Sequence, residues 1–289
     1  MRIVIKNEYG SLEIGGGNHP SARLLDAAGL GLPNKEIEVI AFAGQAGQTI
    51  NSIKDSTRTI TISFDFYGGQ SQIEKIYKLL YKEVGIYITV GDKKRKITGI
   101  CVNPEEVQKI IYGAWYKLVL QFVCAEPYFS DFYNTKISLS QRTDLFPNVC
   151  ENGEWFIELP AVATERISKA HIYNRGDVKL YPKIIINNNS LSDIESETYG
   201  VLIQNETTGA KIILNYDSQP NEIVTIDLPH RKIISNINGN ITNMISDDTV
   251  LADFYLIEGG NILSTINLNS YEDISVLIEY NNNYAMAVI

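Results

Sequence analysis

Three consecutive glycines near the N-terminus are the first residues that suggest a chemistry. Gly15, Gly16 and Gly17 are compatible with a phosphate-binding loop, in which backbone amides and a lysine surround the phosphate. That motif requires G-x-x-x-x-G-K followed by Ser or Thr, whereas His19 and Pro20 follow here. Glycine alone gives mainly backbone freedom, so we interpret the segment as a loop that binds no cofactor.

Adjacent carboxylates occur at Glu105-Glu106, Asp247-Asp248 and Glu272-Asp273. A glycosidase needs two carboxyl groups about 5–10 Å apart on either side of the sugar bond. Nothing in the sequence places these pairs in an apolar cleft, and adjacent acids in loops are usually solvated. A G-x-S-x-G nucleophile motif is missing, and the three histidines show no metal-ligand spacing. We predict no catalytic residues, no cofactor, no metal and no enzymatic activity.

One dense basic run, Lys93-Lys94-Arg95-Lys96, follows the hairpin-turn signal Gly91-Asp92. The run favours either a contact with an anionic surface or a solvated hairpin tip. The chain carries a net charge of −9, whereas proteins dedicated to nucleic acids usually have an excess of Lys and Arg. We expect a solvated tip and no specific nucleic-acid binding.

Length and composition indicate a globular protein. The 289 residues suggest two domains at a typical ~100–200 residues each. Hydrophobic residues make up 44% and charged residues 20%, which is an ordinary balance. The three widely spaced cysteines do not form a disulfide framework. We expect no membrane span, because no apolar stretch approaches ~20 residues, and no cleaved leader.

Alternating apolar and polar residues predict strands in the first half, at Thr57–Tyr67, Ile37–Ala43 and Ile86–Val90. Tyr112–Ala125 is apolar on both faces and is expected to be a central strand. One helix is predicted, because apolar residues recur at 73, 76, 77, 80 and 84. We expect Ser71 and Glu74 to form its capping box and Gly85 to end it.

The second half is predicted to be all β, because short β-branched runs alternate with Asn, Gly, Ser and Asp clusters. The division we expect is a first domain at 1–134, a linker at 135–152 and a second domain at 153–289. The fold class is mainly β, with one helix beside the first set of strands. The runs are Trp155–Leu159, Lys183–Ile186, Val201–Asn205, Lys211–Leu214, Ile223–Leu228, Phe254–Ile257 and Ile274–Tyr280.

A series of short motifs resembles the distal tail proteins of long-tailed, siphovirus-type bacteriophages. Each motif is weak alone, but their order and spacing cover nearly the whole chain. Two positions depart from the family: Glu126, where Asp is commoner, and Glu258-Gly259 in place of Pro-Gly. The motifs are Leu24–Pro33, Gly44–Gly47, Arg58–Ile62, Phe122–Phe129, Asn174–Asp177 before Tyr181-Pro182, Asn205–Gly209, Ile226-Asp227 and Phe254 followed by Glu258–Asn261.

The resemblance implies a tail-tube-like β-barrel or split barrel with one flanking helix, followed by a galectin-like or carbohydrate-module-like β-sandwich. It implies a homohexameric ring between the tail tube protein and the tail tip, in the virion, assembled in the host bacterial cytoplasm. The implied partners are the tail-associated lysin or tail tip protein and the receptor-binding protein, and DNA only passes through the channel. Six copies at −9 each would carry −54, which would repel DNA from the channel wall.

We expect ring contacts from the segment Leu24–Gly47 and the strand Thr57–Tyr67, since ring interfaces use strand edges and apolar patches. A tail tube subunit is a less favoured alternative, because such subunits consist of the barrel alone. The ring-interface candidates are Leu24, Leu25, Leu30, Leu32, Arg58, Ile60 and Ile62.

The alternative function is that of a carbohydrate-binding module or adhesin that recognises host cell-wall sugars through aromatic side chains. Core packing is the commoner role for such residues. The candidates for a glycan platform are Trp155, Tyr173, Tyr199 and Tyr216, with Tyr181 and Tyr255 as further aromatics of the same half.

Overall fold

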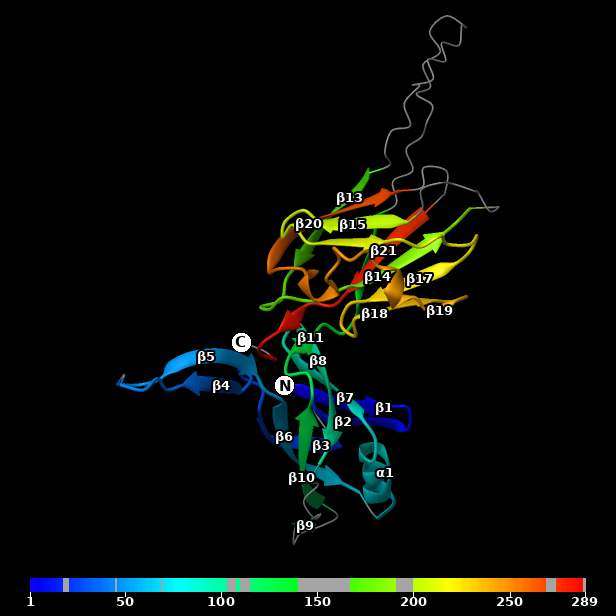
Figure 1. Ribbon diagram of the computed structural model, residues 1–289. Helices are drawn as coiled ribbons and strands as arrows, with labels where there is room; N and C mark the ends of the chain where they lie inside the picture. The colour runs from blue at the N-terminus through cyan, green and yellow to red at the C-terminus, as the bar shows by residue number, and fades with distance from the viewer. Residues whose placement is uncertain are drawn as a thin grey trace, which may run out of the picture. The chain divides into compact units, whose positions relative to one another are not determined.

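A computed structural model describes residues 1–17, 21–44, 46–68, 70–102, 108–109, 115–139, 167–190, 200–268 and 274–287 (Figure 1). The chain forms two compact units. The first consists of Met1–Tyr133 together with Asn283–Ile289, and the second of Asn134–Asn282.

An antiparallel sheet forms most of the first unit, in the order β2-β1-β7-β8-β10-β6-β3. A Cβ on Gly15 in β2 would lie 3.4 Å from the Leu24 Cβ in β3, so the two ends of this path come close. No hydrogen-bonded ladder joins them within the described residues, which gives a split-barrel arrangement. The strands are β1 (Arg2–Asn7), β2 (Gly10–Gly15), β3 (Ala22–Ala28), β6 (Arg58–Tyr67), β7 (Val84–Val90), β8 (Lys93–Cys101) and β10 (Trp115–Cys124), with the short strands β9 (Gln108–Lys109), β11 (Phe129–Ser130) and β22 (Asn283–Tyr284).

Strand alternation builds the core of the first unit, because every second side chain points inward. This confirms the strands predicted around β6, β7 and β10, residues 112–114 lying outside the described part. The fully buried side chains include Ile3, Ile5, Ile14, Ile60, Ile62, Phe64, Ile86, Ile88, Leu120 and Phe122.

The single helix, α1 (Gln70–Leu80), contacts β2 and buries Ile76, Leu79 and Leu80. The predicted ends of this helix were wrong. Ser71 lies within the helix, and the chain leaves it after Leu80 because Val84, which is 1% exposed, is buried as the first residue of β7. Gly85 therefore lies in a strand and is no helix cap.

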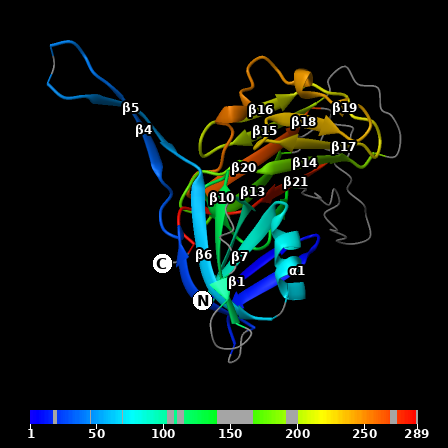
Figure 2. The same cartoon turned by 90° about the horizontal axis from the view of Figure 1, so that it is seen from below.

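A separate two-stranded ribbon projects from the first unit (Figure 2). Its strands are β4 (Lys35–Ile40) and β5 (Thr49–Asp55), which pair only with each other among the described residues.

Two antiparallel sheets form the second unit, and they share one apolar core, as predicted for a sandwich (Figure 1). The strand runs predicted here match closely, except that Phe254–Ile257 forms only the single bridge Leu180↔Leu256 after a 3-10 turn, and 155–159 lies outside the described residues. One sheet is β12 (Thr135–Ser138), β21 (Ile274–Tyr280), β14 (Lys183–Asn188), β17 (Ile223–Asp227), β18 (Lys232–Ser235) and β19 (Gly239–Asn240); the other is β13 (Ile167–Asn174), β20 (Gly259–Asn267), β15 (Val201–Asn205) and β16 (Lys211–Leu214), and the 3-10 turns are η1 (Thr242–Met244) and η2 (Leu251–Asp253).

The C-terminal segment returns to the first unit. Tyr284 in β22 pairs with Phe129 in β11, and the Ala287 N–H donates to the Leu30 carbonyl at 2.9 Å. The second unit is therefore inserted between β11 and β22. The expected division differs at both margins, because residues 135–138 form a strand rather than a linker and residues 283–287 do not belong to the second unit.

Candidate functional site

The β4–β5 ribbon, residues 35–55, exposes large apolar side chains. Ile37, Val39, Ile50 and Ile53 are between 45% and 55% exposed, and Phe42 near its tip is 56% exposed. Every residue of β4 is exposed. The ribbon therefore buries little of its own apolar surface.

The pairing of the two strands gathers these side chains on one face. Ile37 lies opposite Ile53 and Val39 opposite Ile50, and a bulge between Glu38 and Val39 keeps the second pair in line. Because side chains alternate between faces, Glu36 lies on the opposite face, across from Lys54. The ribbon has one mainly apolar face and one mainly polar face, which also carries Ile40.

An isolated two-stranded hairpin is at best marginally stable in water. In the part of the chain that the structure describes, no further strand pairs with either edge of this ribbon, and natural proteins usually cover or disrupt such edges. An exposed apolar patch with a polar rim typically marks an interaction surface. These three properties make the ribbon the candidate functional site of the first unit.

Specific hydrogen bonds fix the base of the ribbon to the sheet. The Ser56 N–H donates to the Asn34 carbonyl at 2.8 Å, and the Tyr128 hydroxyl donates to Asp55 Oδ2 at 2.5 Å. Burial, followed by this bond to Asp55, raises the pKa of Tyr128 to about 12. Tyr128 belongs to the Phe122–Phe129 motif, so that motif anchors the ribbon.

Arg58 forms a buried polar cluster beside the ribbon base. Its side chain donates to four carbonyl oxygens, those of Gly29, Gly31, Pro127 and Ala285, at 2.6–2.7 Å. The residue is 3% exposed, and this burial lowers its pKa. The guanidinium carbon lies 4.5 Å from the centre of the Phe129 ring. Arg58 thus joins β6 to three other segments of the first unit.

Gly29 shows why this cluster needs a glycine. Its φ is +83°, and a Cβ there would lie 2.0 Å from the Thr59 carbonyl oxygen. The close approach lets the Gly29 carbonyl reach Arg58 at 2.7 Å. Two of the sequence motifs, Leu24–Pro33 and Arg58–Ile62, are therefore coupled by direct contact.

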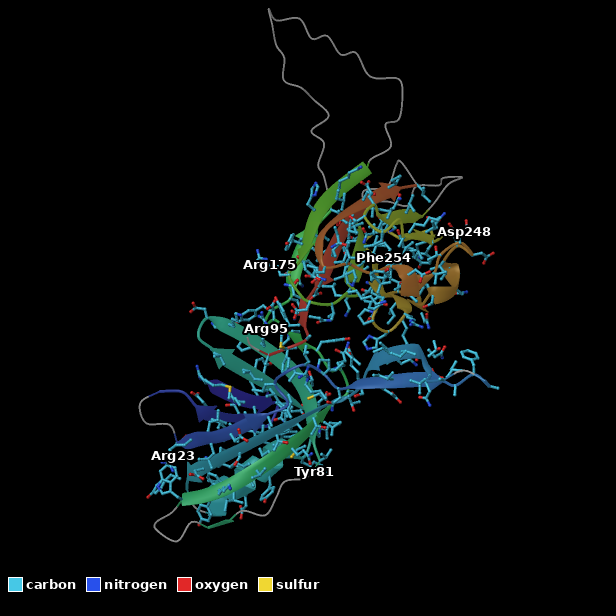
Figure 3. The ribbon with its side chains drawn as sticks, turned by 90° about the vertical axis from the view of Figure 1, so that its left-hand side faces the viewer. Arg23, Tyr81, Arg95, Arg175, Asp248 and Phe254 are labelled. Carbon is cyan, nitrogen blue, oxygen red and sulfur yellow. The ribbon has the colours of Figure 1, made fainter. Side chains whose placement is uncertain are left out.

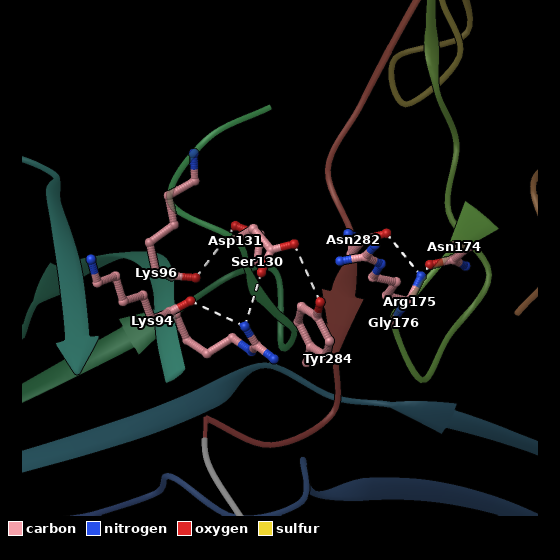
Figure 4. Close-up of polar contacts among 10 residues, drawn as sticks. Lys94, Lys96, Ser130, Asp131, Asn174, Arg175, Gly176, Asn282 and Tyr284 are labelled. Atoms are coloured by element: carbon pink, nitrogen blue, oxygen red, sulfur yellow. Dashed lines mark hydrogen bonds and ion pairs between the residues drawn. The ribbon is translucent and has the colours of Figure 1, made fainter. Parts of the chain in front are cut away.

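A second arginine holds the C-terminal segment. Arg95 pairs with Asp131 at 2.9 Å and lies 3.4 Å from the Tyr284 ring centre, and the Tyr284 hydroxyl donates to Asp131 at 3.2 Å (Figure 4). Its side chain is 16% exposed. The solvated tip predicted for residues 93–96 is thus wrong for Arg95, because its position in β8 places it against β22.

A third arginine lies on the outer face of the sheet. Arg23 in β3 pairs with Asp65 in β6 at 2.9 Å, and its guanidinium lies 4.6 Å from the Trp115 ring centre in β10 (Figure 3). These contacts cross three neighbouring strands and hold β3 at the margin of the sheet.

The ring-interface candidates divide into exposed and buried residues. Leu25 is 49% and Leu32 is 66% exposed, while Leu24 and Leu30 are half-buried against the core. Arg58, Ile60 and Ile62 are buried, because they serve the inside of the first unit, so they are not available to a neighbouring copy. Leu25 and Leu32 remain as the exposed candidates.

The candidate glycan aromatics of the second unit lie in different settings. Tyr173 is 62% exposed, while Tyr181 and Tyr255 form an edge-to-face pair beside Lys179. Trp155 and Tyr199 lie outside the described residues. The glycan platform stays a prediction, and Tyr173 is its most accessible member among the described aromatics.

Tyr216 is held by a buried carboxylate. Its hydroxyl donates to Glu222 Oε1 at 2.6 Å, and Asn238 donates to the same hydroxyl. Burial, followed by the bond to Glu222, raises its pKa. Glu222 is 0% exposed and also accepts from the Gln219 N–H and from Ser235. The carboxylate thus organises the loop between β16 and β17, and Tyr216 is fixed within it.

The described residues contain no cluster of His, Cys, Asp and Glu that could hold a metal ion. Within the same part of the chain, no helix has the length and apolarity needed to cross a bilayer.

Residues 175–284 match a family model described as the siphovirus-type tail component, C-terminal domain. The second unit thus carries the C-terminal domain of a siphovirus-type tail component. The family predicted from the sequence motifs is thus confirmed, and the match covers most of the second unit. A comparison with curated protein sequences gives no match.

The fold of the whole chain is similar to those of phage proteins of known structure. The SPP1 Dit (gp 19.1) protein, described as a paradigm of the hub adsorption apparatus in Gram-positive infecting phages, is 12% identical with a TM-score of 0.61, over 90% of this chain and 93% of that chain. A chain of the phage P2 baseplate in its activated conformation with Ca is 11% identical with a TM-score of 0.51, over 96% of this chain and 97% of that chain. At these identities the likeness concerns the fold.

Sequence reasoning missed the second strand of the ribbon. The predicted interface segment ended at Gly47, whereas Ile50 and Ile53 in β5 complete the apolar face. Gly44 and Gly47 mark a turn after the alternating run 35–39, but Ile50 and Ile53 are three residues apart, so period two does not identify the second strand.

Proposed function

We propose that this Dit-like chain is a structural distal tail protein, the hub of the phage baseplate. Six copies form a closed ring that joins the tail tube to the tail tip protein and holds the tail-associated lysin and the receptor-binding protein. The ring is built in the host bacterium and remains in the virion, and DNA passes through its central channel. The observation that carries the proposal is the likeness in fold to the SPP1 hub protein over both units, 90% of this chain.

The β4–β5 ribbon supports self-association. A ring forms when each copy offers one surface to a different surface of the next copy. Leu32, which is 66% exposed, lies three positions before the start of β4, so the apolar face of the ribbon continues into the exposed part of the Leu24–Pro33 segment. We assign this continuous surface to the contact with the neighbouring copy.

The native mass of the purified chain tests this proposal. Mass photometry of the wild type should show a ring of six copies in equilibrium with monomer. A variant in which a Gly-Ser turn replaces residues 35–55 should stay monomeric, because it lacks the apolar face. The Asn34 and Ser56 backbones are already hydrogen-bonded at 2.8 Å, so the shortened loop should close without strain.

A matched control changes only the mainly polar face of the ribbon. Glu36→Gln combined with Lys54→Gln keeps the net charge and should leave the ring intact. A wild type that stays monomeric at every concentration would contradict the proposal, and so would a shortened variant that assembles normally.

A further inference from the structure

A groove of about 360 Å³ lies on the outer face of β1 and β7 in the first unit. Arg2 and Lys6 of β1, Tyr87 and Thr89 of β7, and Phe132 and Tyr133 line it. The volume is at the lower end of the ~300–1,000 Å³ that is typical of small-molecule sites. None of these side chains belongs to the ribbon or to the Arg58 cluster.

Strand alternation and one glycine create this groove. Ile3 and Ile5 of β1 are buried in the core, so Arg2 and Lys6 point outward. Gly85 lies opposite Lys6 on β7, and a Cβ at Gly85 would lie 2.9 Å from Tyr87 Cε2. The missing side chain therefore leaves room for the Tyr87 ring along the strand.

The aromatic wall of the groove is preorganised in part. The Tyr87 and Phe132 rings meet edge to face with their centres 5.1 Å apart, and the Lys96 Nζ donates to the Phe132 carbonyl at 3.3 Å. Tyr133 beside them is 83% exposed. The Tyr87 ring is thus packed against Phe132, and the Tyr133 ring is exposed to solvent beside it.

Positive charge gathers around these rings although the whole chain carries −9. Lys94 and Lys96 of β8 lie opposite Thr89 and Tyr87 of β7. They therefore extend the row of basic side chains that begins with Arg2 on β1. Arg2 is paired with Glu13 at 2.7 Å, with both side chains about half exposed. Such exposed pairs are weak, so an anionic ligand can compete for Arg2.

We propose that this groove binds a phosphorylated sugar. Lys6 and Arg2 contact the phosphate through charge-assisted hydrogen bonds, and the faces of Tyr87 and Tyr133 contact the apolar face of the sugar ring. The hydroxyls of Tyr87, Tyr133 and Thr89 supply partners for the sugar hydroxyls. This abundance of hydroxyls favours a sugar over a nucleobase. The same chemistry occurs in a free sugar phosphate and in a phosphate-bearing wall polymer.

Calorimetry on the full chain with glucose 6-phosphate tests the proposal. Glucose and inorganic phosphate should each bind at least about tenfold more weakly, because each lacks half of the contacts. Phosphorylated dextran represents a phosphate-bearing polymer. If its affinity per phosphate exceeds that of glucose 6-phosphate, the ligand is a polymer. If the two affinities are equal, the ligand is the free sugar phosphate.

Three variants of the groove and two control variants separate the contribution of the charged side chains from that of the aromatic rings. Lys6→Glu should weaken glucose 6-phosphate binding by about tenfold or more, because the variant loses the contact with the phosphate and repels it. Lys75→Glu on the exposed face of α1 is the control and should change the affinity less than about twofold.

The aromatic rings are tested separately. Tyr133→Ala should weaken glucose 6-phosphate binding by about fivefold, whereas Tyr81→Ala, at an equally exposed tyrosine, should leave it unchanged. Gly85→Ala should displace the Tyr87 ring and reduce the preference over inorganic phosphate.

Two results would overturn the proposal. One is an affinity for AMP equal to that for glucose 6-phosphate, which would indicate a nucleotide site. The other is the absence of sugar-phosphate binding together with a native mass altered by Lys6→Glu, which would make the groove a contact between copies. The groove does not depend on the ring, since a monomeric chain would retain it.

Discussion

Two neighbouring regions of the first unit reverse the usual placement of charge and apolar surface. Arg58 is buried, and four carbonyl oxygens accept its hydrogen bonds. The ribbon that begins nearby leaves its isoleucines about half exposed. A buried charge is costly unless hydrogen bonds replace water, and here they do. Among the described residues nothing covers the isoleucines of the ribbon within one copy. The comparison therefore separates a region that is completed internally from one whose apolar face is left exposed.

Arg58→Met should have the largest effect, because it leaves buried carbonyl groups without donors. Unsatisfied buried acceptors cost about 1–3 kcal/mol each, so we expect the free energy of unfolding of the first unit to fall by about 3 kcal/mol or more. Urea unfolding followed by Trp115 fluorescence, in a Trp155→Phe background, measures it. Arg2→Met removes an exposed arginine and should cost less than about 1 kcal/mol. Similar losses in both variants would show that the carbonyl contacts contribute little.

Two glycines, one in the buried region and one in the ribbon, allow the same comparison for the backbone. Gly29→Ala should destabilise the first unit by about 2–3 kcal/mol, because its Cβ would meet the Thr59 carbonyl. Gly47 in the ribbon also has a positive φ, but nothing lies within 4 Å of its Cβ position. Gly47→Ala should therefore cost less than about 1 kcal/mol. The same urea unfolding experiment compares the two variants. An equal loss of stability in Gly29→Ala and Gly47→Ala would show that the close contact with the Thr59 carbonyl does not matter.

Ile37→Thr combined with Ile53→Thr addresses the ribbon face directly. Because both side chains are about half exposed in one copy, the stability of the monomer should change by less than about 0.5 kcal/mol. Assembly should weaken by about tenfold or more, since apolar area would be lost from the contact between copies. Mass photometry over a dilution series measures the strength of assembly, and urea unfolding measures the stability of the monomer. Unchanged assembly would place the contact elsewhere.

Local pattern predicted β6 and the first strand of the ribbon, β4, but neither the second strand, β5, nor the environments of these strands. The alternation of Ile60, Ile62 and Phe64 identified β6 and its inward face, because burial on one side of a sheet imposes period two. The same alternation in β4 does not mark a core, since the apolar face of a strand can be covered by its own chain or by another. That distinction depends on the partner strands, and these are set by contacts distant in sequence.

Long-range contacts also explain what was missed at Arg58 and at the chain end. An arginine in a strand pattern is usually exposed, and only the return of Ala285, 227 residues later, provides one of its acceptors. Gly29, Arg58 and Tyr128 each belong to a motif that carries the family resemblance, but the motifs alone give no reason for these residue types. The structure supplies it: the three residues lie around the base of the ribbon.

The smallest predicted effect concerns the bond between the ribbon base and the sheet. Tyr128→Phe removes the donor to Asp55 and should cost about 1 kcal/mol at pH 8. The pKa of Tyr128 is raised from 10.0 to about 12 in the folded chain, so the protonated hydroxyl stabilises the fold. That stabilisation is complete below pH 10 and is lost as the pH rises toward 12.

The difference in unfolding free energy between wild type and Tyr128→Phe should therefore shrink between pH 10 and 12. Burial also raises the pKa of Cys124, to about 11, but that group is present in both proteins and cancels from the difference. Urea unfolding at half-unit steps from pH 8 to 11.5 measures the trend, with Tyr81→Phe as the control for an exposed tyrosine. A difference that stays constant over this range would show that the pKa of the Tyr128 hydroxyl is not raised in the folded chain.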